Sequence, residues 1–235
     1  MEEIFRQDSY IRSCSATVTI ADESGIRLDR TVFYPTGGGQ PGDVGRLVRA
    51  DGSIVTIRDT IKGTAPGEVV HLPVEPSDIA PGEIVTAEID WDRRHRLMRM
   101  HTCLHLLSAV VPYPVTGGQV QTDKGRLDFD IPEAALDKDA ITAQLNELVA
   151  ADLAVQPRWI TDAELAAKPE LVKTMSVKPP SGQGKVRLIE IPGRDLQPCG
   201  GTHVARTGEI GRVQVVKIEK KGRINRRVVV AFVTD

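Results

Sequence analysis

The chain has 235 residues, of which 40% are hydrophobic and 26% charged, and its formal net charge is −2. This composition is typical of a globular protein, and the length allows one large or two modest hydrophobic cores. The slightly negative charge excludes long-range attraction to nucleic acid, so such binding needs local basic patches. Aromatic residues, at 4%, are too few for the aromatic base-stacking sheets of one class of RNA-binding proteins.

The N-terminus and the cysteines indicate a reducing, aqueous compartment. Met-Glu-Glu is acidic, and no apolar run approaches the roughly 18 residues of a membrane span, so we expect a cytoplasmic protein with no membrane partner. Cys14, Cys103 and Cys199 are odd in number and far apart. This pattern favours reduced thiols over a disulfide framework.

Residues 1–90 predict an N-terminal β domain. Short alternating or β-branched runs are separated by turn signals, of which Asp51-Gly52 is the strongest hairpin signal. The expected strands are 16–21, 26–34, 46–50, 54–58, 68–72 and 84–89. Because no long helical period interrupts them, we expect a small barrel or sandwich.

A glycine-rich loop, Gly37-Gly38-Gly39-Gln40, lies inside this β domain. Successive glycines permit positive φ and let backbone N–H groups approach an anionic ligand. The same run also suits a sharp turn between strands. It lacks the Gly-Lys-Ser/Thr of a Walker loop and the helix that follows a dinucleotide fingerprint.

A helix is predicted from Trp91 to Pro112, with Asp92 as the expected N-cap. It carries His101 and His105, which are four residues apart and therefore share one face. Histidines on an apolar helix are commonly hydrogen-bonded core residues, but at this spacing they also suit one metal ion. Cys103 points away from that face and is expected to be a packing residue.

Residues 91–235 predict an α+β domain with an antiparallel sheet. After the histidine helix we expect a hairpin, a helix over 133–153, a strand over 155–160, a short helix and three final strands. Thr161 and Glu164 have the spacing of a capping box at the start of the short helix. The expected hairpin strands are 116–121 and 126–131, and the final strands are 186–191, 212–218 and 227–233.

A second ligand pair, Cys199 and His203, has the same four-residue spacing. One cysteine and three histidines form the nitrogen and sulfur donor set that zinc prefers. About a hundred residues separate the pairs, so the metal would join distant parts of one domain. Four protein ligands are usual for structural zinc, whereas Gly200-Gly201-Thr202 beside the site offers donors that a structural site does not need, and the sequence leaves both roles open.

Two basic clusters could contact a polyanion or could be solvated surfaces. One lies at the start of the histidine helix and the other near Gly222. Their members are Arg93, Arg94, His95, Arg96 and Arg99 in the first, and Lys217, Lys220, Lys221, Arg223, Arg226 and Arg227 in the second.

The motifs Tyr34-Pro-Thr-Gly-Gly-Gly-Gln40, His101-Thr-Cys-Leu-His105 and Cys199-Gly-Gly-Thr-His203, in this order, resemble the editing domain of alanyl-tRNA synthetase. The chain looks most like the free-standing AlaX editing proteins of medium length. The resemblance implies a hydrolase that removes serine, and in some members glycine, from the acceptor end of tRNA(Ala). It also implies Zn²⁺ held by His101, His105, Cys199 and His203.

The resemblance further implies a threonine that reads the serine hydroxyl, and Thr116 is preferred over Thr122. The expected catalytic residues are Thr116, Gln119, Gly200, Gly201 and Thr202, and the expected substrate-binding residues are Gly37, Gly38, Gly39, Gln40, Arg93, Arg94 and Lys221. Two other functions fit the residues: a zinc-stabilised tRNA-binding module without hydrolysis, and a small-molecule hydrolase unrelated to tRNA.

Overall fold

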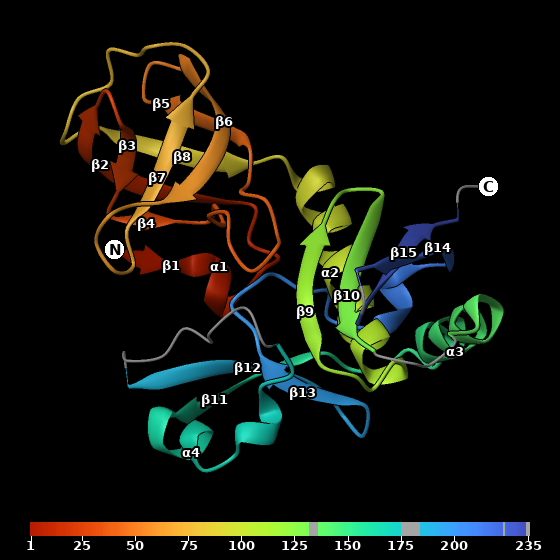
Figure 1. The fold of residues 1–235 in the computed structure, drawn as a ribbon. Helices are drawn as coiled ribbons and strands as arrows, with labels where there is room; N and C mark the ends of the chain where they lie inside the picture. The colour runs from red at the N-terminus through yellow and green to blue at the C-terminus, as the bar shows by residue number, and fades with distance from the viewer. Residues whose placement is uncertain (132–135, 175–183, 223, 234–235) are drawn as a thin grey trace. The chain divides into compact units, whose positions relative to one another are not determined.

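A computed structural model describes residues 1–131, 136–174, 184–222 and 224–233 (Figure 1). The chain forms two compact units, Met1–His95 and Arg96–Asp235, and the boundary falls inside helix α2 (Trp91–Val110). Both units mix short helices with mainly antiparallel sheets, so the predicted α+β class is confirmed. Among the described residues, no helix is long and apolar enough to cross a membrane.

The first unit is built on a closed six-stranded barrel, and the barrel prediction is confirmed. Alternate residues of each strand face inward, as Val55 and Ile57 do, and close a core around Leu28 and Leu47. In order around the barrel the strands are β2 (Ser13–Asp22), β3 (Gly25–Leu28), β7 (Val69–Pro73), β6 (Ile54–Lys62), β5 (Gly45–Arg49) and β8 (Ile84–Ile89). Every neighbouring pair is antiparallel.

The N-terminal segment adds two elements that the sequence did not predict. Strand β1 (Glu2–Glu3) leads into the short helix α1 (Ile4–Gln7) and pairs in parallel with β4 (Arg30–Thr31). The single strand predicted over 26–34 is therefore divided, because Asp29 donates its N–H to Thr17 of β2 and the chain then turns to β1.

Helix α2 is the central element of the second unit. It is buried from Met100 to Ser108, and Met100 and Leu104 pack closely on Gly125 of the neighbouring sheet, where a side chain would collide with them. The predicted N-cap, Asp92, is wrong by two residues: Asp90 precedes the helix, and its carboxylate accepts the N–H of Arg93. Asp92 lies inside the first turn.

The sheet beside α2 has four antiparallel strands in the order β14-β15-β10-β9. Their bounds are β9 (Val115–Val120), β10 (Lys124–Asp130), β14 (Val213–Lys221) and β15 (Asn225–Phe232). Helix α3 (Lys138–Ala150) covers the β14 edge, where Asn146 and Thr142 bond the backbone of Val213 and Val215. The helix begins later than predicted because Asp137 caps it, and residues 133–135 of the predicted span lie outside the described residues.

A second, three-stranded sheet has the order β11-β12-β13, so the second unit has two antiparallel sheets where one was predicted. Its strands are β11 (Gln156–Thr161), β12 (Lys185–Ile191) and β13 (Asp195–Pro198). A hydrophobic cluster around Leu165, Val186 and Leu188 covers one face. Helix α4 (Asp162–Ala166) has the predicted capping box of Thr161 and Glu164, and the 3₁₀ helices η1 (Pro169–Leu171) and η2 (Thr207–Ile210) flank the sheet along the chain.

Candidate metal centre

The two ligand pairs predicted from sequence meet in the second unit. His101 and His105 lie one turn apart on α2, Cys199 follows the end of β13, and His203 lies four residues later. Their four ligand atoms all lie within 4.8 Å of one another. The three histidines are buried, and the whole cluster belongs to one unit.

The spacing of the donors suits a tetrahedral ion. Cys199 Sγ lies 3.2 Å from His203 Nε2 and 3.6 Å from His101 Nε2. A tetrahedral zinc with ordinary Zn–N and Zn–S bonds separates its nitrogen and sulfur ligands by about 3.6 Å. The donor types and these two separations therefore fit a zinc ion.

A carboxylate orients His105 toward the cluster. Its Nδ1 lies 2.8 Å from Asp195 Oδ2, and the other oxygen of Asp195 accepts a hydrogen bond from Lys173 Nζ at 2.6 Å. Gln197 donates to Asp195 Oδ2 at 2.8 Å and to Ser108 Oγ at 3.0 Å. This network fixes the imidazole with Nδ1 on the carboxylate, the arrangement that accompanies metal-binding histidines.

A neutral hydroxyl orients His203. Thr102 is fully buried, and its Oγ1 donates to the carbonyl of Met98 at 2.9 Å. Because its only proton is used there, Thr102 Oγ1 accepts from His203 Nδ1 at 3.1 Å, which places the proton of that ring on Nδ1. The Nε2 atom then faces Cys199 with its lone pair. The sequence analysis did not predict this role, although Thr102 directly follows the ligand His101 in the sequence.

The electrostatics of the cluster favour a thiolate. Burial raises the pKa of Cys199, but the positive charge of nearby His101 and the hydrogen bonds from His101 and His105 outweigh it and lower that pKa well below the usual value. Burial lowers the pKa of His203 to about 3, so this ring is neutral. Burial also lowers the pKa of His105, but the hydrogen bonds to Asp195 and Cys199 and the charges of these two groups together outweigh it and raise that pKa to about 9. A metal must displace that proton, so acid weakens metal binding.

Hydrogen bonds from Arg187 hold the backbone of the loop that carries Cys199. Its Nη1 donates to the carbonyls of Cys199 and Gly201, at 2.9 Å each. The amide of Gly201 donates to Cys199 Sγ at 3.4 Å. Thr202 is fully buried beside it. Catalytic roles for Gly200, Gly201 and Thr202 stay predictions.

The predicted hydroxyl reader, Thr116, lies on β9. Its Oγ1 is 3.1 Å from the carbonyl of Asp128 and 3.2 Å from Asn225 Oδ1. Gln119 is exposed on the same strand, and its side chain accepts a bond from Arg126. Their catalytic roles stay predictions.

The glycine-rich loop in the first unit is a tight turn. Gly37 and Gln40 exchange two backbone hydrogen bonds of 3.0 Å, and Gly38 and Gly39 between them have φ of +58° and +83°. These angles are those of a type I′ turn, which glycine adopts without strain. Contact of this turn with the substrate stays a prediction.

The predicted basic contacts differ in accessibility. Arg94 is fully buried, and its guanidinium binds Asp43 and the carbonyls of Ser9 and Val32 within the first unit. Arg94 therefore has a structural role and cannot reach a phosphate, which corrects its assignment as a substrate-binding residue. Arg93 donates to the carbonyl of Gly42, and exposed Lys221 lies 3.6 Å from Glu219.

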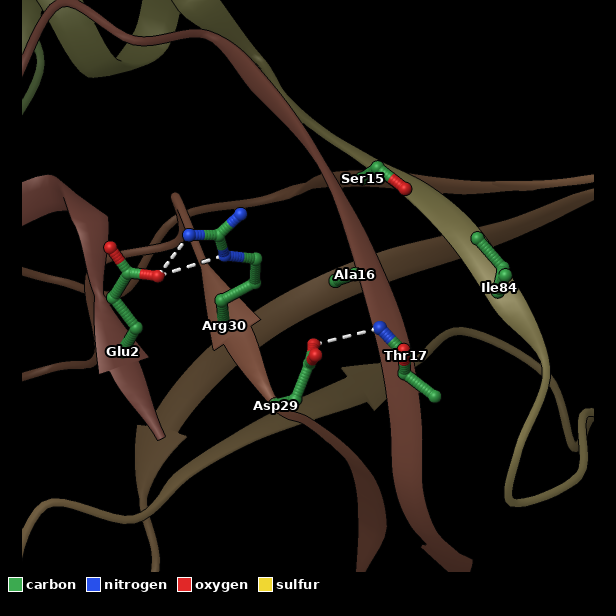
Figure 2. Close-up of a pocket in the computed structure, with 7 residues that line it drawn as sticks. All are labelled: Glu2, Ser15, Ala16, Thr17, Asp29, Arg30 and Ile84. Carbon is green, nitrogen blue, oxygen red and sulfur yellow. Dashed lines mark hydrogen bonds and ion pairs between the residues drawn. The ribbon is translucent and has the colours of Figure 1, made fainter.

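One shallow pocket opens on the barrel, with a volume of ≈ 470 Å³ (Figure 2). Arg30 donates to Glu2 at 2.8 Å, and Asp29 accepts the N–H of Thr17 at 2.7 Å. Among its seven lining residues the charged groups are thus engaged with neighbours. We do not consider it a reactive site.

Comparison with known proteins agrees with this geometry. Residues 186–229 match the family "Threonyl and Alanyl tRNA synthetase second additional domain", and residues 6–93 match "tRNA synthetases class II (A)". Both matched families are domains of aminoacyl-tRNA synthetases. Over 93% of its length the chain is also 33% identical to an alanine–tRNA ligase of Saccharolobus islandicus, of which it spans 25%.

Two shorter relatives match along nearly their whole length. The alanyl-tRNA editing protein AlaX-M of Saccharolobus solfataricus is 33% identical, with 97% of both chains covered. The AlaX-M protein of Methanosarcina barkeri is 35% identical, with 96% of both covered. The chain therefore belongs to the alanyl-tRNA editing proteins of the AlaX-M family, and the resemblance noted in the sequence is confirmed.

Proposed function

We propose that this chain is a zinc-dependent aminoacyl-tRNA hydrolase that removes serine from mischarged tRNA(Ala), with glycyl-tRNA(Ala) as a second candidate substrate. The observation that carries the proposal is the cluster of His101, His105, Cys199 and His203 in a chain that matches alanyl-tRNA editing proteins from end to end. A cytoplasmic location follows from this role.

The need for such an enzyme has a physical basis. A synthetase site shaped for alanine cannot strongly reject serine or glycine, because one added hydroxyl or one lost methyl changes binding by only ~1–3 kcal/mol. A second site can select for the serine hydroxyl, which forms a hydrogen bond that alanine cannot make. Alanine would leave the polar partner of that bond buried and unsatisfied.

Zinc would be held by the four ligands, where it supplies a positive charge that binds and polarises oxygen atoms of the terminal adenosine or ester. Asp195 and Thr102 keep Nε2 of His105 and His203 directed into the cluster. Water then attacks the ester carbonyl, and the serine and the 3′-terminal ribose hydroxyl separate. The amide of Gly200 and the hydroxyl of Thr202 are the candidate donors to the developing oxyanion.

A deacylation assay tests the proposal directly. We expect purified protein to release serine from seryl-tRNA(Ala) at least about tenfold faster than alanine from alanyl-tRNA(Ala), the ratio expected for one hydrogen bond. Cys199→Ala serves as the inactive control. Equal hydrolysis of the two esters would refute editing, and tight tRNA binding without turnover would favour the alternative of a zinc-stabilised binding module.

Thr116→Val tests which residue reads the serine hydroxyl. This change keeps the shape and removes the donor, so we expect seryl-tRNA hydrolysis to slow by about ten- to a hundredfold. The serine-to-alanine ratio should fall with it. Thr122→Val, in the adjacent turn, tests the alternative reader and should leave the ratio unchanged if Thr116 is the reader. An unchanged ratio in Thr116→Val would reject this residue and make Thr122 or Gln119 the next candidates.

A further inference from the structure

Trp159 is an exposed aromatic residue with no role in the proposed function. Its side chain lies on β11 and is 51% exposed. The other tryptophan, Trp91, is partly buried in the first unit, where Arg12 lies 4.3 Å over its ring and His95 stacks on it at 5.3 Å. A large apolar side chain that stays in water often marks a binding surface.

The sheet register connects Trp159 to the metal centre. Trp159 pairs with Arg187 on β12, and the amide of Cys199 donates to the carbonyl of Arg187 at 3.1 Å, which continues the β12–β13 ladder by one residue. Residues that face each other across antiparallel strands project to the same side. Trp159, Arg187 and Cys199 therefore form one row across the sheet. With strands about 4.8 Å apart, Trp159 lies about 10 Å from Cys199, measured between Cα atoms.

The two faces of this sheet differ in what covers them. Ile160, Val186 and Leu188 project to the opposite face, which the hydrophobic cluster with Leu165 closes. The face of Trp159 carries the metal loop at one edge and the exposed indole at the other. Exposed Lys185 pairs with Thr161, two positions along from Trp159, and alternation places it on the indole's face. An aromatic ring beside a cation suits a nucleotide, whose base stacks and whose phosphate is anionic.

We propose that Trp159 stacks on an unpaired base at the 3′ end of the aminoacyl-tRNA and that Lys185 contacts an adjoining phosphate. The inference rests on the proposed function, because the ester to be cleaved is carried on the 3′-terminal ribose. With that ribose at the metal centre, the indole lies about three stacked nucleotides away, or fewer when the strand is extended. Trp159 thus holds the unpaired strand while the metal ligands hold the reacting end.

Fluorescence tests the stacking independently of catalysis. In a Trp91→Phe background Trp159 is the only tryptophan. We expect uncharged tRNA(Ala) to quench its emission, and tRNA(Ala) trimmed of its unpaired 3′ nucleotides to quench it much less. Equal quenching by both RNAs, or none by either, would overturn the assignment.

Kinetics provide the second arm. Stacking of one base contributes ~1–3 kcal/mol, so Trp159→Ala should lower kcat/KM for seryl-tRNA(Ala) by about 5- to 150-fold, while Trp159→Tyr should retain most activity. Zinc content and Tm should not change, since the side chain is exposed. Val216→Ala, an exposed apolar position on β14, is the matched control.

If the unaltered protein hydrolyses seryl-tRNA(Ala) and Trp159→Ala does so equally well, the stacking role fails and the proposed function stands. If the unaltered protein hydrolyses neither ester, the function fails while quenching still decides the stacking.

Discussion

Two buried histidines, His71 in the first unit and His105 in the second, show how the same residue serves the fold or a site. His71 Nδ1 lies 3.0 Å from the carbonyl of Ile26, and its Nε2 lies 2.8 Å from Thr31 Oγ1. Both nitrogens are thus used by the barrel. In His105, Nδ1 hydrogen-bonds to Asp195, and the other hydrogen bond of the ring is with Cys199, a member of the ligand cluster. Burial alone does not mark a ligand; what marks it is a ring nitrogen that faces other donors.

The buried carboxylates repeat this contrast. Asp43 pairs with Arg94 and accepts the N–H of Tyr34 at 2.6 Å, so its charge is balanced inside the barrel unit. Asp195 pairs with Lys173 and also holds a histidine whose far nitrogen faces the cluster. The hydrogen bonds of Asp43 stay among residues of the fold, whereas those of Asp195 lead through His105 to the four residues that can bind an ion.

The largest effect we expect comes from breaking the closed network. Arg94→Met should leave Asp43 buried without its cation and lower the free energy of unfolding of the first unit by about 3–5 kcal/mol. Urea denaturation followed by Trp91 fluorescence in a Trp159→Phe background measures it. Arg93→Met, which loses one bond to a carbonyl, is the control. Equal destabilisation by the two changes would contradict the role given to Arg94.

The next effect concerns the pH dependence of the first unit. Burial lowers the pKa of His71 to about 4, below the value of about 6.5 in an unfolded chain. Between these values the unfolded state binds a proton that the folded state does not, so stability falls as pH falls from about 6.5 to 4. The loss approaches about 3 kcal/mol and is absent above pH 6.5.

Denaturation curves at several pH values provide the measurement, with Trp91 as the probe. His71→Gln should remove this pH-dependent component even if it lowers stability at neutral pH. His95→Gln, at the end of the same unit, is the matched control. A His71→Gln profile as steep as that of the unaltered protein would show that other groups cause the acid loss.

Smaller effects, on zinc affinity, should follow from changing the side chains that hydrogen-bond to the ligands. Asp195→Asn and Thr102→Val leave all four ligands in place, so each should bind zinc, with an affinity lower by about 10- to 100-fold. Competition with a chromophoric chelator measures this. Asp195→Asn should have the greater effect because it also removes a charge. Asp128→Asn, at an acidic position away from the ligands, is the control; similar losses in all three would mean a general loss of stability.

Sequence reasoning predicted what depends on short-range pattern. The alternation in residues 54–58 and the turn at Asp51-Gly52 marked the barrel, and four-residue spacing on a helix marked His101 and His105. It missed β1 and β13, since two- to four-residue strands have too few alternations to register and are fixed by partners elsewhere in the chain.

The side chains that orient the metal ligands were not predicted either, because their partners lie far away in sequence. Asp195 is 90 residues away in sequence from His105, and Thr102 is 101 residues away from His203, so only the folded chain brings each pair together. Arg94 was misassigned because a run of arginines indicates a charged surface. Its neighbour in space, Asp43, is 51 residues away in sequence.

The zinc content of the purified chain tests the central claim most directly. Elemental analysis should give about one zinc per chain, and Cys199→Ala should reduce it to near zero, while His71→Gln should keep it because both nitrogens of that ring serve the barrel. Chelation should lower the Tm of the unaltered protein. No stoichiometric metal in the unaltered chain, or full zinc content in Cys199→Ala, would contradict the assignment of His101, His105, Cys199 and His203 as a metal centre.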